Sequence, residues 1–217
     1  NYKNGIATNP AFLDDYSSLI KACIDVYELT FKIDWLEQAK ALTQYVAEHF
    51  SDKQETLFYY TPDWQNDIVV RKKEYFDNAT PSGNSMMAEN LFKLGLYFDN
   101  ADWRQLAFDM NSKIQNIAQQ YSASFGNWLV GLTTHEFGFN EIVITGKNLM
   151  SESKEILKEF LPINIIASSE TKEKRLPIFN DKNFSDKTYF YLCRNFSCEQ
   201  PVFSTQELLN SINSFAH

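Results

Sequence analysis

The 217-residue sequence is poor in cysteine, glycine and proline, with 3, 7 and 6 residues respectively. Three cysteines, unevenly spread along the chain, are too few for the disulfide scaffold of a small secreted domain, so we expect a reducing, cytoplasmic setting. The scarcity of glycine and proline, together with 18 Phe, 11 Tyr and 4 Trp, is typical of helices that pack through large side chains. With 44% hydrophobic and 22% charged residues, the chain can bury a sizeable core as one large domain or two small ones.

The sequence also lacks extended basic clusters and long apolar runs. Its net charge is −8, and the short basic runs at 71–73 and 172–175 are most simply solvated, which argues against a nucleic-acid partner. No apolar run approaches the roughly 18 to 20 residues of a membrane span, and the first ten residues resemble neither a signal peptide nor a lipidation site, so we expect no membrane association. Because the chain does not begin with methionine, we interpret it as a fragment or processed product whose targeting signals would lie upstream.

Familiar metal and cofactor motifs are missing. His49, His135 and His217 have no ligand spacing with a cysteine or carboxylate, so we expect no metal site. The sequence has neither a phosphate-binding glycine loop nor a GxSxG elbow, and we expect no cofactor.

The segment CRNFSC places Cys193 and Cys198 five positions apart, directly after a predicted strand. This spacing is neither a zinc site nor a thioredoxin CxxC motif. The favoured interpretation is one thiol at a strand end and one in a loop, and the alternative is a redox-sensitive dithiol if the two sulfurs are close. Cys23 is predicted to lie in the core.

The first half of the chain contains a repeat of two helical hairpins. Amphipathic periodicity predicts helices over 12–31 and 34–50, with Asp34 capping the second, and again over 82–98 and from Asp102 onward. The offset is 68 residues and pairs apolar positions with apolar positions, so we expect the hairpins to stack side by side as part of a larger helical array. Between them, 56–61 and 67–75 are predicted to form a β-hairpin.

The pattern changes near residue 136. The segments EIVITG, INIIASS and TYFYLC are predicted strands, and SKEILKEFL and STQELLNSINSF are predicted helices. This alternation predicts a small, largely parallel α/β unit. We therefore place a domain boundary near 134–140, separating a helical region (1–135) from a C-terminal α/β domain (136–217).

The segment DNATPSGNS (77–85) precedes the third predicted helix and is unusually polar. Thr80 is a predicted N-cap and Pro81 fits the first turn. Helix initiation does not require the polar residues Ser82 and Asn84 that follow. The 68-residue offset places this helix start beside the start of the first helix. Two positively polarised helix N-termini then face one mouth, which suits a hydroxyl-rich or anionic ligand.

Two carboxylates and an arginine could act at this mouth. Asp15 borders the apolar face of its helix, and a role in a cleft and a purely structural role remain open for it, whereas Asp14 is predicted to cap the helix on its polar face. Asp77 and Arg71 could supply a carboxylate and a guanidinium to the rim.

Three aromatic residues occur in the predicted β-hairpin: Tyr59, Tyr60 and Trp64. They could stack on a sugar ring, but cross-strand packing is the favoured interpretation.

Several stretches together resemble a known family. FLDDYSSLIKACIDVYELT, RKKEYFDNATPSGNSMMAENLFKL, EIVITG and YLCRNFSCEQPV look like the C-terminal part of the spermatogenesis-associated, thioredoxin-like proteins, and the resemblance covers nearly the whole chain. It implies an upstream thioredoxin-like domain in the same chain. It also implies a helical region similar to the (α/α) toroids of six-hairpin glycosidases and N-acylglucosamine 2-epimerases. The expected fold is then mainly α, with αα-hairpins of an incomplete toroid, a β-hairpin insertion and a small α/β domain.

By analogy with those toroids, the resemblance places five residues at the toroid centre: Asp15, Tyr16, Asp77, Ser82 and Asn84. The leading hypothesis is a region that binds a small polar ligand, such as a sugar, with Asp15 and Asp77 as candidate catalytic carboxylates. Tyr16, Arg71, Ser82 and Asn84 would be ligand-binding groups. The alternative is a non-catalytic scaffold or redox-partner module that works with the upstream thioredoxin-like domain, with Cys193 and Cys198 as its redox contact.

Overall fold

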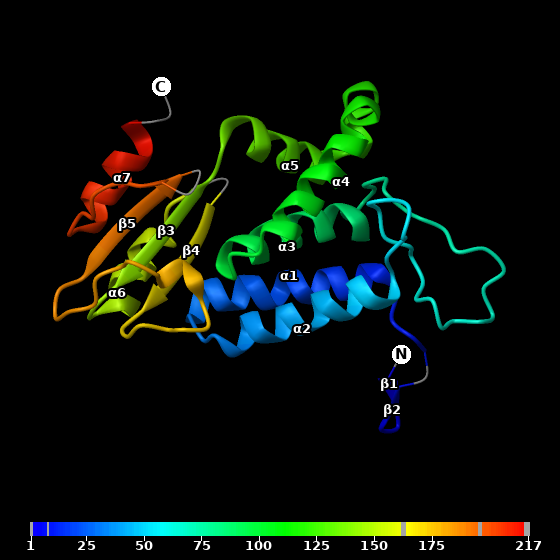
Figure 1. The fold of residues 1–217 in the computed structure, drawn as a ribbon, viewed down its shortest axis with the longest axis horizontal. Helices are drawn as coiled ribbons and strands as arrows, with labels where there is room; N and C mark the ends of the chain where they lie inside the picture. Colours follow the sequence, from blue (N-terminus) through cyan, green and yellow to red (C-terminus); the bar gives the residue numbers. More distant parts are fainter. Residues whose placement is uncertain (1, 8, 162–163, 195–196, 215–217) are drawn as a thin grey trace.

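The computed structural model describes residues 2–7, 9–161, 164–194 and 197–214 (Figure 1). Seven α-helices and two small sheets occur in these residues. The helices are α1 (Leu13–Thr30), α2 (Asp34–His49), α3 (Gly83–Tyr97), α4 (Ala101–Gln120), α5 (Gly126–Phe137), α6 (Leu149–Ile156) and α7 (Thr205–Ser214). The strands are β1 (Tyr2–Lys3), β2 (Ile6–Ala7), β3 (Asn140–Thr145), β4 (Asn164–Ser169), β5 (Tyr189–Arg194) and β6 (Ser197–Cys198).

The two predicted hairpins, α1–α2 and α3–α4, are confirmed, and they pack together through α1 and α3 (Figure 1). Contacts between α1 and α3 keep a nearly constant offset: Lys21 Nζ lies 2.7 Å from Glu89 Oε1, 68 residues on, and the Tyr97 hydroxyl lies 2.8 Å from Glu28 Oε1, 69 residues back. A constant offset between two helices means that they run parallel. The sequence repeat is therefore also a repeat in space.

The helix starts differ from the predicted ones in detail. Ser82, not Thr80, is the N-cap of α3, and its hydroxyl accepts the Ser85 N–H (3.2 Å). The reason is that Asp77 accepts the Ser82 N–H, which keeps 78–81 outside the helix. Asp34 is the first residue of α2 rather than its cap.

The predicted β-hairpin is wrong, because the described chain has no regular strand between α2 and α3. The Tyr60 N–H does donate to the Lys72 carbonyl (2.7 Å). The neighbouring backbone groups, however, bond to the helices instead: the Tyr59 N–H donates to Phe50, and the Tyr60 carbonyl accepts from Leu13. The segment is therefore an irregular arm held against the N-terminus of α1 and the C-terminus of α2.

The C-terminal sheet has the order β4-β3-β5-β6 and is mixed rather than largely parallel. The β3–β4 pair is parallel and is connected through α6, as predicted. In contrast, β5 is antiparallel to β3, because the 170–188 connection contains no crossover helix within the described residues and returns the chain to the end where β4 finishes. The change from helices to strands falls between Phe137 and Asn140, inside the predicted boundary region.

The sheet is covered on both faces. Ile142, Ile144 and Phe190 cluster with buried residues of α6 and α7, whereas Val143 and Tyr191 belong to the same cluster of buried residues as the helical hairpins. This alternation follows from the two-residue side-chain period of a strand. No helix in the described ranges combines the length and apolarity that a bilayer span requires.

Candidate functional site

Asp77 joins the N-termini of two helices. Its Oδ1 accepts the Ser82 N–H (2.8 Å) and the Ser85 hydroxyl (2.7 Å) at the start of α3, and its Oδ2 accepts the Asn127 N–H (2.8 Å) at the start of α5. The Trp128 N–H lies 3.4 Å from the same oxygen. The residue is only 6% exposed. Asp77 is therefore a shared cap, which satisfies orphan N–H groups and complements the positive ends of both helices.

Asp14 and Asp15 exchange the orientations expected from the sequence. Asp14 points inward, where its Oδ1 accepts the Gly83 N–H (2.8 Å), and burial raises its pKa although this hydrogen bond opposes the rise. A Cβ at position 83 would collide with the Asp14 carboxylate, so this close approach requires glycine. Asp15 is exposed and accepts the Phe12 N–H (2.8 Å) in a capping arrangement. Its catalytic role stays a prediction.

Asn84, by contrast, is fully buried and holds the arm against α3. Its Oδ1 accepts the Phe58 N–H (2.8 Å), and its Nδ2 donates to the Phe58 carbonyl (3.0 Å) and the Glu74 carbonyl (2.8 Å). The amide thus uses both of its donors and its acceptor on backbone groups that have no strand partner. Buried amides are usually satisfied in this way.

Arg71 and Tyr16 also make structural contacts. Arg71 donates to the Thr61 carbonyl (2.6 Å) and the His49 carbonyl (3.0 Å), and its guanidinium lies 4.1 Å from the centre of the Tyr59 ring. Tyr16 stacks on Tyr45 with 5.1 Å between ring centroids, and burial together with the Tyr45 hydrogen bond raises its pKa to about 12. Both residues consolidate the packing of the arm and the first hairpin.

The arm aromatics contact neighbouring protein groups, but they do not pack across strands, because the arm has no regular strands within the described residues. Tyr60 stacks on Phe12 with 4.9 Å between ring centroids, and Trp64 Nε1 donates to the Tyr45 hydroxyl (3.1 Å). The Tyr59 hydroxyl donates to Asp52 (2.8 Å).

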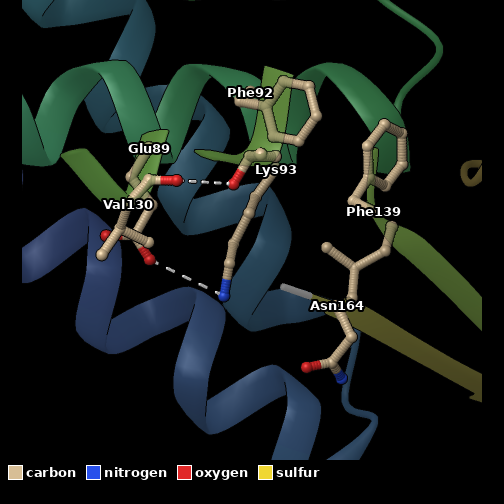
Figure 2. Close-up of a pocket in the computed structure, with 8 residues that line it drawn as sticks. Glu89, Phe92, Lys93, Val130, Phe139 and Asn164 are labelled. Carbon is tan, nitrogen blue, oxygen red and sulfur yellow. Dashed lines mark hydrogen bonds and ion pairs between the residues drawn. The ribbon is translucent and has the colours of Figure 1, made fainter. Parts of the chain in front are cut away.

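An open hollow lies elsewhere, between α3 and α5. A cavity of about 150 Å³ is lined by Glu89, Phe92, Lys93, Val130, Thr134, Phe139, Asn164 and Ile165 (Figure 2). A second cavity of about 40 Å³ shares Glu89, Phe92, Val130 and Thr134 with the first, and it adds polar groups from Ser85, Asn111, Asn127 and His135. We call these two adjoining cavities the α3–α5 groove. Asp15 and Asp77 do not line it.

A chain of alternating charges borders this groove. Glu89 Oε1 lies 3.9 Å from Lys93 Nζ (Figure 2) and 2.7 Å from Lys21 Nζ. Lys93 Nζ in turn lies 3.8 Å from Glu28 Oε2. Burial raises the pKa of Glu28, opposed by Lys93 and the Tyr97 hydroxyl. Burial would lower the pKa of Lys21, but the nearby carboxylates of Glu89, Asp25 and Glu28 together outweigh it and the net shift is upward.

Two asparagines that line the groove each have a buried amide atom with no hydrogen-bond partner among the described residues. The two atoms are Asn111 Oδ1 and Asn127 Nδ2. Asn111 Nδ2 donates to the Ala107 carbonyl (2.9 Å) and lies 3.3 Å from His135 Nε2. Burial lowers the pKa of His135, which favours its neutral form. A Cβ at position 131 would collide with the Asn111 side chain, so Gly131 allows α4 and α5 to approach closely here.

The groove is not evident from the sequence, although one sequence signal points to it. The 68-residue offset pairs Lys21 with Glu89 and Asp25 with Lys93, which are opposite charges at matched positions of α1 and α3. The sequence offered a reason to test His135 only as a metal ligand, and not as a residue of a ligand-binding groove. No group of three or more His, Cys, Asp or Glu side chains within the described ranges is arranged to hold a metal ion.

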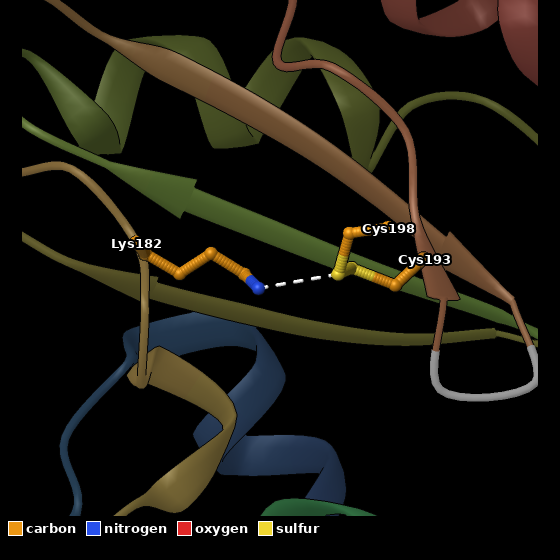
Figure 3. The surroundings of a disulfide bond; sticks show 3 residues. All are labelled: Lys182, Cys193 and Cys198. Atoms are coloured by element: carbon orange, nitrogen blue, oxygen red, sulfur yellow. Dashed lines mark hydrogen bonds between the residues drawn. A yellow bond between two sulfur atoms is a disulfide. The ribbon is translucent and has the colours of Figure 1, made fainter.

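The two C-terminal cysteines form a disulfide between β5 and β6, where Cys193 and Cys198 are directly opposite (Figure 3). The favoured interpretation of two separate thiols is therefore wrong. Cys23 is buried in the core, as predicted.

The chain was compared with protein families and curated proteins. No family model matches it. It is 26% identical over 212 residues to an uncharacterised protein of Caenorhabditis elegans, which covers 94% of this chain and 29% of that protein. It is 23% identical over 208 residues to spermatogenesis-associated protein 20 of Homo sapiens and of Rattus norvegicus, with 91% of this chain and 26% of each relative covered.

The chain thus spans less than a third of the length of these relatives, and their names state no activity. The matches extend over more than nine tenths of the chain and support its resemblance to the spermatogenesis-associated proteins.

Proposed function

We propose that this chain forms one wall of a binding site for a small, hydroxyl-rich molecule such as a sugar, located in the α3–α5 groove. One observation carries the proposal: Asn111 and Asn127 both line the smaller cavity, and Asn111 Oδ1 and Asn127 Nδ2 are buried without a hydrogen-bond partner among the described residues. An unsatisfied buried polar group costs about 1 to 3 kcal/mol, so such groups call for a partner. An amide acceptor and an amide donor together match the dual donor and acceptor character of a hydroxyl group.

The remaining lining fits the same ligand class. Glu89 and Lys93 offer a charged acceptor and a charged donor, and His135 in its neutral form offers one of each. Phe92 supplies an apolar ring of the kind that packs against the C–H face of a sugar. A cavity of about 150 Å³ is below the roughly 300 to 1,000 Å³ of complete ligand pockets, which fits a wall to which further chain would be added.

The proposal includes a toroid in which α1, α3 and α5 form the inner layer and α2 and α4 the outer layer. The parallel packing of α1 on α3 and the contact of α3 with α5 support this layering. The chain matches 26 to 29% of its relatives, so additional hairpins would complete the ring. In that arrangement the α3–α5 groove faces the ring centre.

The test is ligand-observed NMR on the full chain with a panel of neutral sugars, amino sugars and sugar phosphates. We expect saturation transfer to at least one sugar class, lost in Asn127→Ala and weakened in Glu89→Gln. The matched control is Glu48→Gln, an exposed carboxylate on α2, which should bind as the parent does. Equal binding by all variants would place the ligand elsewhere. No binding by a folded chain would favour the non-catalytic scaffold.

A further inference from the structure

The Cys193–Cys198 disulfide lies in an unusual setting for a structural cross-link. Cys193 is 4% exposed on β5, whereas Cys198 is exposed on the short edge strand β6. Lys182 comes from the connection between β4 and β5 and places its Nζ 3.2 Å from Cys198 Sγ (Figure 3). One cysteine is therefore exposed and has a cationic group beside its sulfur, while the other cysteine is buried.

A hollow opens next to the sulfurs. It has a volume of about 340 Å³, and its lining includes Cys193, Cys198, Lys182 and three carboxylate side chains, those of Asp99, Glu141 and Asp181. A second sulfur atom can therefore approach Cys198 without displacing the core. Three carboxylates against one ammonium give the hollow a negative balance, which disfavours an anionic thiol such as glutathione.

We propose that Cys193 and Cys198 form a reversible dithiol–disulfide couple that exchanges electrons with a protein dithiol, with Cys198 as the reactive sulfur and Lys182 as its positioning residue.

The exchange balances in the reducing direction as follows. A thiolate of the partner dithiol attacks Cys198 Sγ, a mixed disulfide forms, and the Cys193–Cys198 bond breaks with Cys193 leaving as a thiolate. The second partner thiol then attacks the mixed disulfide, which releases Cys198 and closes a disulfide in the partner. Two electrons and two protons pass to this chain, and the partner dithiol is oxidised.

In the oxidising direction Cys198 is the nucleophile and Cys193 the resolving cysteine. An ammonium next to a thiol stabilises the thiolate, which is the form that attacks a disulfide. The groups that face Lys182 from the surrounding elements are Glu141 on β3, Asp181 beside it and the Tyr191 ring on β5, 5.1 Å from Nζ. Burial lowers the pKa of Lys182, and the two carboxylates oppose this shift and help to keep the amine charged.

The first experiment equilibrates the full chain with reduced and oxidised dithiothreitol at varied ratios, traps thiols with a maleimide and maps them by mass spectrometry. We expect Cys193 and Cys198 to gain and lose label together, while buried Cys23 stays unlabelled as an internal control for folding. A disulfide that opens only when Cys23 also becomes labelled, or that does not re-form, would overturn the proposal.

The second experiment isolates the role of Lys182. In a Cys193→Ser background we expect Lys182→Met to slow alkylation of Cys198 at pH 7 about three- to fourfold, for a thiol pKa rise of about one unit partly offset by higher nucleophilicity. The control is Lys172→Met, an exposed lysine of the same connection, which should leave the rate unchanged. Equal rates in the two variants would remove Lys182 from the proposal.

A third measurement needs no cysteine variant. Thioredoxin, as a protein dithiol, should reduce the parent disulfide faster than glutathione does at equal thiol concentration. Lys182→Met should slow the release of Cys198 from the mixed disulfide with thioredoxin severalfold, because Lys182 stabilises the departing Cys198 thiolate. Faster reduction by glutathione would refute the protein-dithiol assignment. If the Cys193→Ser chain does not fold, the role of Lys182 is decided by comparing the rates at which thioredoxin reduces the Lys182→Met and Lys172→Met variants.

Discussion

Replacing Asp77 by alanine tests whether this carboxylate holds two helices together. The substitution removes the acceptor of the Ser82 N–H and Ser85 hydroxyl at α3 and of the Asn127 N–H at α5. Loss of a cap costs about 1 kcal/mol per helix, and a buried donor left without a partner adds about 1 to 3 kcal/mol. We therefore expect the free energy of unfolding to fall by about 3 to 5 kcal/mol.

Urea unfolding followed by far-UV circular dichroism measures this loss. Asp77→Asn keeps one oxygen acceptor and should lose about half as much. The matched control is Asp102→Ala, an exposed carboxylate in the first turn of α4, for which the helix-dipole contribution is about 0.3 to 1 kcal/mol. If Asp77→Ala were no more destabilising than this control, the shared cap would not be what keeps Asp77 buried.

Two further predictions concern the start of α3, and a third concerns Glu28 near the C-terminal end of α1. Asn84→Ala removes three hydrogen bonds of a fully buried amide, so we expect a loss of about 2 to 4 kcal/mol in urea unfolding and faster proteolysis of 51–82. Gly83→Ala forces a methyl group against Asp14 and should lower the free energy of unfolding by about 1 to 3 kcal/mol; an unchanged urea midpoint would contradict this packing. The pKa of Glu28 is raised above 4.5 by burial, so the unfolded chain loses this proton at a lower pH than the folded chain. The stability contributed by Glu28 should therefore fall as pH rises from about 4.5 through the folded pKa, and Glu28→Gln should flatten that part of the pH–stability curve.

The helical repeat was predictable because its signal is local and periodic. The apolar spacing predicted that Ile20, Cys23 and Tyr27 are buried on α1, and the matched offset predicted that α1 packs on α3. Neither signal predicted the orientations of Asp14 and Asp15, which are exchanged. The helix cap at Ser82 was missed because its position depends on Asp77, five residues earlier and outside the helix. Residue preferences at a helix start do not include such contacts.

Longer-range contacts account for the larger errors. The arm has the aromatic and β-branched residues that are typical of strands. Its backbone nevertheless bonds to helix ends: the Tyr59 N–H donates to the Phe50 carbonyl at the end of α2, and the Tyr60 carbonyl accepts from Leu13 at the start of α1. Helix α5 was not recognised in a short apolar segment with two glycines, and its first N–H groups are capped by Asp77, 50 residues upstream. The α3–α5 groove depends on α5 and could not be assembled without it.

The disulfide was missed for a different reason. A spacing of five residues is compatible with many loop geometries, and the pairing became evident only when β5 and β6 placed Cys193 and Cys198 opposite each other.

The shared core of helices and sheet has a consequence for any attempt to divide the chain. The Tyr97 hydroxyl at the end of α3 lies 3.0 Å from the Ile166 carbonyl on β4, and one face of the sheet is buried against the hairpins. Cutting the chain at residue 138 would expose the apolar surfaces of this sheet face and of the end of α3, and we expect both fragments to aggregate. Any truncation should therefore remove residues only from the two termini and keep the junction between the helices and the sheet intact.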